Sequence, residues 1–130
     1  QWHRLCALPA FWVGICYDQG SLDAAWDIVK SWDKNDRENL RVAAAEDGLN
    51  ASIGSIRLID IAKETILISE NGLKNRAQAS SNGLYSDESL FLGSLKENIE
   101  KRKSSADELL EKYHGSWNRD LTKIFEEYSY

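Results

Sequence analysis

The sequence is poor in the residues on which several kinds of protein site depend. Its 130 residues include two cysteines, two histidines and one proline, and no methionine. Two cysteines are too few for a disulfide framework, and no Cys or His pair stands at metal-ligand spacing. On one straight helix Cys6 and Cys16 would lie about 15 Å apart, whereas a disulfide needs Cα atoms within about 7 Å. We therefore expect reduced cysteines and a cytoplasmic protein.

Other absences exclude whole classes of function. The chain has no Gly-rich phosphate loop, no nucleophile elbow and no signal-peptide pattern. Its most apolar run is too short to span a bilayer, which needs about 20 apolar residues. The net charge is −5, which disfavours nonspecific binding to nucleic acid. We expect neither nucleic acid nor a membrane as a partner.

The most apolar run is RLCALPAFWVGICYD at residues 4–18. Because proline suits the first turn of a helix, Pro9 predicts a short helix over residues 10–17. This helix is apolar nearly all round, so we expect it to be buried, with Trp12 at the structural centre. No methionine precedes this segment, and we expect the chain to be the C-terminal piece of a larger protein.

Hydrophobic periodicity predicts helices along the rest of the chain. Ser21 is the expected N-cap of a helix whose apolar face, from Leu22 to Trp32, belongs to the core. Further helices are predicted over residues 36–46, 55–78, 87–102, 105–114 and 119–128, with a Ser- and Gly-rich loop at 79–86. Gly72 is a candidate break in the long helix, whose predicted apolar stripe is Ile56, Ile59, Ile66 and Leu73. Asp33 or Asn35 is the expected cap of the third helix, and Ser55 that of the long helix. Ser105 with Glu108 fits a capping box. The predicted fold is all-α, with six or seven helices in a single segment, residues 1–130.

Four motifs resemble one enzyme family. They are RLCALPAFWVGICYD at 4–18, LDAAWDIVKSW at 22–32, LLEKYHGSW at 109–117 and IFEEYSY at 124–130. In this order they resemble the C-terminal third of the plant and alphaproteobacterial type of glutamate–cysteine ligase. Residues 34–56 and 77–88 do not match that pattern by eye. Without the resemblance, no cluster of residues in the chain indicates a reaction.

The resemblance implies a reaction for a larger protein. Such enzymes use ATP and magnesium to join the γ-carboxylate of glutamate to cysteine through a γ-glutamyl phosphate, the first step of glutathione synthesis. Their catalytic sheet would precede residue 1. This chain would then be the helical flank of a larger α+β enzyme that resembles glutamine synthetase. We expect the chain alone to be inactive, to contain no catalytic or metal-binding residue, and to bind no cofactor.

The resemblance also suggests roles for the first residues. Trp2 is a candidate apolar wall for the substrate, and Arg4 a candidate partner for a carboxylate or phosphate. The alternative is that both pack against missing strands. For His3 and Arg4 this structural role is favoured, because the family often has Arg at position 3 and this chain has His there. Cys6 matches a cysteine that enters a redox-linked disulfide with an upstream partner. Cys16 stands where relatives have an aliphatic residue, which predicts a buried apolar filler.

Two hypotheses from different classes follow. In the first, the chain is part of a glutamate–cysteine ligase and associates with the upstream part of that enzyme or with a second copy. In the second, it is a non-enzymatic all-α module that binds a partner protein through an aromatic surface. Under the first, the run at 4–18 should leave an apolar patch uncovered.

Overall fold

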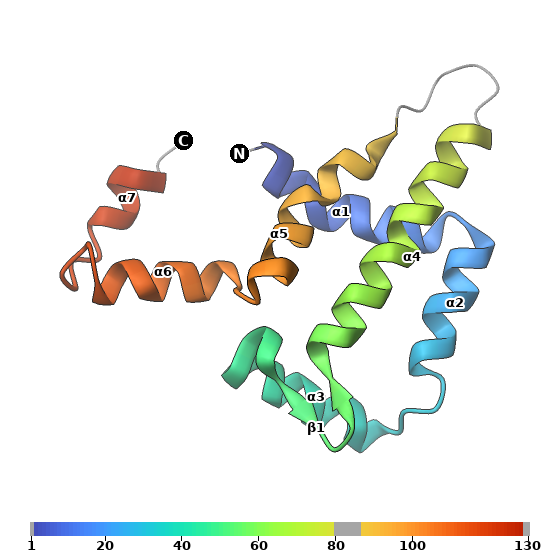
Figure 1. The fold of residues 1–130 in the computed structure, drawn as a ribbon, viewed down its shortest axis with the longest axis horizontal. Helices are drawn as coiled ribbons and strands as arrows, with labels where there is room; N and C mark the ends of the chain where they lie inside the picture. The colour runs from blue at the N-terminus through green and yellow to red at the C-terminus, as the bar shows by residue number, and fades with distance from the viewer. Residues whose placement is uncertain (1, 80–86, 129–130) are drawn as a thin grey trace.

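The computed structural model describes residues 2–79 and 87–128, and for Trp2 and His3 only the backbone. Seven α-helices make up most of this part of the chain (Figure 1), which confirms the all-α prediction. They are α1 (Trp2–Cys16), α2 (Gln19–Val29), α3 (Lys34–Asp47), α4 (Leu58–Ala79), α5 (Gly93–Lys101), α6 (Ser105–His114) and α7 (Lys123–Tyr128). Two 3₁₀ turns, η1 (Gly48–Asn50) and η2 (Glu88–Leu92), and a hairpin of β1 (Ser52–Ile53) and β2 (Ile56–Arg57) connect them. Ala79 ends α4, and residues 80–86 of the predicted loop lie outside the described residues.

Helices α1 and α4 cross with their backbones almost in contact (Figure 1). A Cβ atom on Gly72 would lie 1.8 Å from the carbonyl oxygen of Gly14, and one on Gly14 would lie 2.2 Å from that of Ser69. The fully buried Ser69 hydroxyl donates a 2.9 Å hydrogen bond to the Phe11 carbonyl, so its polar atom is satisfied. The sequence suggested a break at Gly72, but α4 continues through it. The missing side chain at Gly72 instead allows α1 to approach α4 closely.

The core forms around this crossing. Its buried apolar residues come from α1, α4 and η2, and they are Ala10, Ile66, Leu73 and Leu92. Partly buried residues pack around them: Phe11, Val13, Phe91, Leu95 and Ile99. The predicted stripe on the long helix is confirmed for Ile59, Ile66 and Leu73, which are buried on α4, whereas Ile56 lies in β2 and is partly buried.

Helix α1 differs from its prediction at its start. It begins at Trp2, and Pro9 lies inside it. A proline within a helix removes one backbone hydrogen bond, which disfavours this position. Burial of Ala7 and Ala10 against neighbouring elements offsets that cost and extends the helix through Pro9.

The prediction that large apolar residues of α1 and α2 are buried was wrong for several of them. Trp12 is 55% exposed and Trp26 is 63% exposed, and Tyr17 is exposed as well. The side of α1 that approaches α4 carries small residues, Ala10 and Gly14, and Ile15 next to them is buried. Trp12 lies outside that contact, so it is not the structural centre.

Asp18, rather than Ser21, caps α2 and also links it to α4. The Asp18 carboxylate accepts hydrogen bonds from the backbone N–H and the hydroxyl of Ser21, at 2.9 and 2.8 Å. Its other oxygen accepts a 3.2 Å bond from the Asn75 amide on α4. The buried Ser21 hydroxyl also lies 3.2 Å from the Ile68 carbonyl. These bonds from Ser21 lower the pKa of Asp18.

Capping boxes mark the starts of α3 and α6. Asp33, one of two predicted caps for the third helix, forms a capping box with Asp36. The box at α6 is Ser104 with Asp107, one residue before the predicted pair. Ser55 caps no helix; it lies in the turn of the hairpin, which was not predicted from the sequence. The last helix begins at residue 123 rather than 119.

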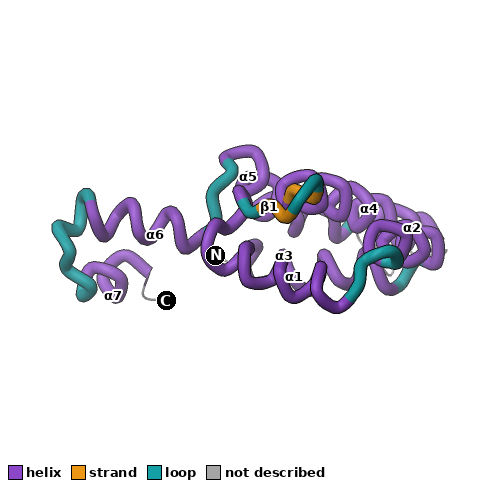
Figure 2. Tube along the Cα trace, turned by 90° about the horizontal axis from the view of Figure 1, so that it is seen from below, coloured by secondary structure: helices purple, strands orange, loops and turns teal. Residues whose placement is uncertain are grey.

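Helices α6 and α7 project from the other helices (Figure 2). They are held to each other by Lys112, whose ammonium lies 2.5 Å from a Glu127 oxygen and 4.9 Å from the centre of the Tyr128 ring. The other Glu127 oxygen accepts a 2.6 Å hydrogen bond from the indole of the buried Trp117. These contacts pack α6 and α7 against each other independently of the main core.

The close crossing generates a stability prediction. Gly72→Ala would force a methyl group into the Gly14 carbonyl, so we expect a loss of about 3 kcal/mol or more in the free energy of unfolding. Gly93→Ala is the matched control, because Gly93 is helical and a methyl group added there would have no neighbouring atom within 4 Å. Its effect should stay within about 1 kcal/mol. Chemical denaturation compares the two, and equal effects would contradict the crossing.

The Asp18 cap generates a pH prediction. Because the folded-state pKa of Asp18 lies below its usual value of 3.8, its stabilisation is present above that value and is lost as pH falls through the folded pKa. Asp18→Asn keeps a good cap but removes the charge. We expect the stability difference between wild type and variant to be larger at about pH 6 than at about pH 2. Denaturation curves at the two pH values check this, and an equal difference at both would refute it.

Candidate functional site

The predicted substrate-binding residues lie in the first turns of α1. The half-exposed Arg4 guanidinium donates a 3.2 Å hydrogen bond to the Glu108 carboxylate in the first turn of α6. An exposed pair of this kind contributes about 0–1 kcal/mol to stability, so Glu108 holds Arg4 only weakly. The contact tests neither of the two roles considered for Arg4, so packing against missing strands and substrate binding both stay predictions. The side chains of Trp2 and His3 lie outside the described residues.

The two cysteines of α1 are both free thiols, and they differ in exposure. Cys6 is half-buried, and nothing in the described part of the chain tests its predicted redox role. Cys16 is exposed, so the prediction of a buried filler was wrong. Cys16 is exposed because it lies on the same outward side of α1 as Trp12.

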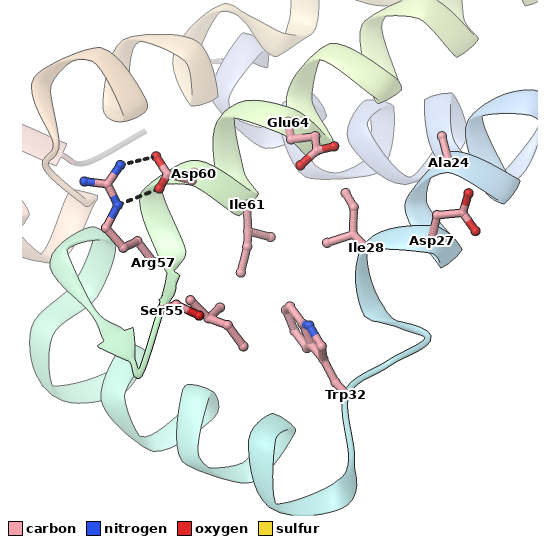
Figure 3. Close-up of a pocket in the computed structure, with 10 residues that line it drawn as sticks. Ala24, Asp27, Ile28, Trp32, Ser55, Arg57, Asp60, Ile61 and Glu64 are labelled. Atoms are coloured by element: carbon pink, nitrogen blue, oxygen red, sulfur yellow. Dashed lines mark hydrogen bonds and ion pairs between the residues drawn. The ribbon is translucent and has the colours of Figure 1, made fainter.

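A cavity of about 390 Å³ lies between α2, the hairpin and the first turns of α4 (Figure 3). Its apolar wall consists of Ala24, Ile28, Trp32, Ile56 and Ile61. Its polar lining consists of Asp27, Ser55, Arg57, Asp60 and Glu64. Sequence reasoning did not bring these residues together, because they come from segments about 30 residues apart and the hairpin between them was not predicted.

The electrostatics of this cavity are acidic. Arg57 donates two hydrogen bonds to Asp60, at 2.5 and 2.8 Å, and these bonds lower the pKa of that carboxyl (Figure 3). The positive charge of Arg57 is therefore already paired. Asp27 pairs with Lys30 at 2.8 Å, and Glu64 is exposed. A cavity whose arginine is already paired does not suit a phosphate group.

The other titratable residues that the structure describes do not assemble a metal site. Within residues 2–79 and 87–128, no three His, Cys, Asp or Glu side chains are grouped so that they could hold a metal ion. Glu127, for example, binds Lys112 and Trp117. No helix in these two ranges has the length and apolar character needed to cross a membrane.

The whole chain, rather than one local motif, matches a known family. Residues 1–127 match Glutamate-cysteine ligase family 2 (GCS2). The chain belongs to this family. The resemblance drawn from the motifs at its two ends is thereby confirmed, and it extends across residues 34–56 and 77–88, where no likeness was visible.

Several plant proteins are similar to the chain over 129 residues, which is 99% of its length. It is 36% identical to a chloroplastic glutamate–cysteine ligase of Solanum lycopersicum and 35% identical to that of Arabidopsis thaliana. It is also 35% identical to glutamate–cysteine ligase A of Oryza sativa subsp. indica. The matched region is 23% of the tomato and Arabidopsis proteins and 25% of the rice protein. The chain thus spans about a quarter of the length of the curated relatives it matches.

The different exposure of the two thiols generates a labelling prediction. Maleimide should modify Cys16 several-fold faster than Cys6, because access limits the reaction of the half-buried thiol. The variants Cys6→Ser and Cys16→Ser isolate each site, and peptide mass spectrometry measures both rates in the wild type. Faster modification of Cys6 would show that the outward side of α1 has been assigned incorrectly.

Proposed function

We propose that this chain is one segment of an ATP-dependent ligase that joins the γ-carboxylate of glutamate to cysteine, the first step of glutathione synthesis. The observation that carries the proposal is the family match over residues 1–127, together with relatives named glutamate–cysteine ligase that align with 99% of the chain. Glutamate and cysteine are the proposed substrates of the whole protein.

We propose that ATP and magnesium bind to the rest of the ligase. Among the described residues, no carboxylates are grouped so that they could hold a metal ion, and Arg57 in the acidic cavity is already paired with Asp60.

The contribution proposed for this chain is positioning. Helix α1 is held in place by its crossing with α4. The position of its first turns is therefore determined by helix packing rather than by surface contacts. Arg4 sits on this fixed helix and is held by one exposed ion pair. In the whole ligase we propose that Arg4 exchanges Glu108 for a substrate carboxylate or phosphate, and that Trp2 provides an apolar wall. Cys6 is proposed as the redox cysteine, with a partner in the rest of the ligase.

A second candidate function has an observation in its favour. The exposed indoles of Trp12 and Trp26 are unusual on a protein surface and would suit a non-enzymatic module that binds a partner protein. The family match favours the ligase, since it covers the chain as a whole. The cytoplasmic location expected from reduced cysteines remains a prediction; the names of the relatives place those proteins in the chloroplast.

Activity of a full-length hybrid tests the proposal. In this hybrid, the chain replaces the matching 23% of the tomato relative. With glutamate, cysteine, ATP and magnesium, we expect γ-glutamylcysteine from the hybrid and none from the 130-residue chain alone. Formation of the dipeptide by the chain alone, or a folded hybrid without activity, would count against the proposal.

The same hybrid tests Arg4. Arg4→Gln should lower kcat/KM by about tenfold or more, as expected for loss of a charged contact of about 1.4 kcal/mol with the substrate. Arg41→Gln is the matched control, because Arg41 also forms an exposed ion pair, with Glu38 on α3. Equal activity of the two variants would assign Arg4 the structural role instead.

A further inference from the structure

One surface of the chain combines large exposed apolar side chains with a hollow. Between α1 and α2 lies a hollow of about 300 Å³. We call its exposed side chains the α1–α2 face, and they are Trp12, Cys16, Leu22 and Trp26. A second hollow of about 250 Å³ adjoins it, because Phe11 and Thr65 line both. Exposed Leu8 on α1 extends the apolar surface into the second hollow.

The α1–α2 face is uncharged. None of the residues that line either hollow is Asp, Glu, Lys, Arg or His, although 28% of the chain is charged. By contrast, charged residues line the cavity between α2 and the hairpin. A continuous apolar surface without charges is typical of a surface that a polypeptide covers. Its occupant must therefore be apolar as well, since an unpaired charge buried there would be costly.

We infer that the α1–α2 face is the surface on which this chain packs against an apolar surface of the remaining ligase polypeptide. This inference rests on the proposed function. The 129 matched residues are only 23% of the tomato relative, so about three-quarters of such a protein lies outside the match and is available to cover the face. A second copy of the chain is the less favourable occupant, because two chains that each carry a net charge of −5 repel one another.

The packing that buries α1 supports this assignment. Small residues on one side of α1 are used for the contact with α4, so that contact cannot also bury Trp12. On α2, Ser21 faces α4 while Leu22 and Trp26 remain exposed beside the hollow. Trp12 of α1 and Leu22 and Trp26 of α2 thus lie on one surface that the described residues leave uncovered.

Maleimide labelling of Cys16 tests the inference in the full-length hybrid. Cys16 lines the hollow, so its labelling should be slower in the hybrid than in the 130-residue chain by about tenfold or more. A Val42→Cys substitution provides the control, because Val42 is exposed on α3 and lines neither hollow. It should be labelled at the same rate in both proteins. Peptide mass spectrometry identifies each modified cysteine.

A pair of leucine variants makes the test specific to the face. Leu22→Glu places a carboxylate in the hollow and should restore Cys16 labelling in the hybrid to within about threefold of its rate in the chain alone. Leu110→Glu makes the same change at an exposed leucine of α6 outside the hollow and should leave the protection intact. Circular dichroism of both variants confirms that they are folded.

The outcomes separate the inference from the proposed function. An active hybrid in which Cys16 is labelled as fast as in the chain alone would overturn the inference and leave the ligase assignment standing. Protection of Cys16 in an inactive hybrid would support the inference while counting against the activity. A dimer of the 130-residue chain in sedimentation, dissociated by Leu22→Glu but not by Leu110→Glu, would overturn it in favour of a second copy.

Discussion

The contact between the backbones of α1 and α4 is the constraint on which the rest of the structure depends. It exists because Gly14 and Gly72 carry no side chain and because Ser69 satisfies its buried hydroxyl on the Phe11 carbonyl. The contact fixes α1 across α4, and η2 and α5 then complete the core around Ala10 and Leu73. Asp18 extends the same junction to α2 by capping that helix and accepting a hydrogen bond from α4.

The same contact explains why so much apolar surface stays uncovered. A close helix crossing needs small residues where the two backbones meet, so a residue as large as Trp12 lies elsewhere on α1. Trp12 and Cys16 therefore line the α1–α2 face beside Leu22 and Trp26. The chain belongs to a ligase family whose curated relatives are about four times as long, and the proposed role of this face is to pack against the rest of such a ligase. In that proposal, one side of α1 stabilises the chain and another side associates with the remaining polypeptide.

Periodicity was sufficient to predict α4, on which Ile59, Ile66 and Leu73 are buried. Residue type placed Asp33 among two candidate caps for α3, and the motifs at the two chain ends were sufficient for the family. Periodicity failed on α1, because hydrophobicity does not distinguish a large residue facing outward from a small residue facing inward. The cap prediction failed at α6, because Ser104 and Ser105 are neighbours and either residue type can cap. The Arg4–Glu108 pair joins residues 104 positions apart, so no local pattern reveals it.

Amide hydrogen exchange measures the central contact most directly. If the crossing organises the fold, amides of α1 near Gly14 and of α4 near Gly72 should exchange with one common free energy, equal to that of global unfolding. Amides of the projecting helices α6 and α7 should exchange through openings of lower free energy (Figure 2). Exchange of α1 through an opening of its own, while α4 stays protected, would contradict the account.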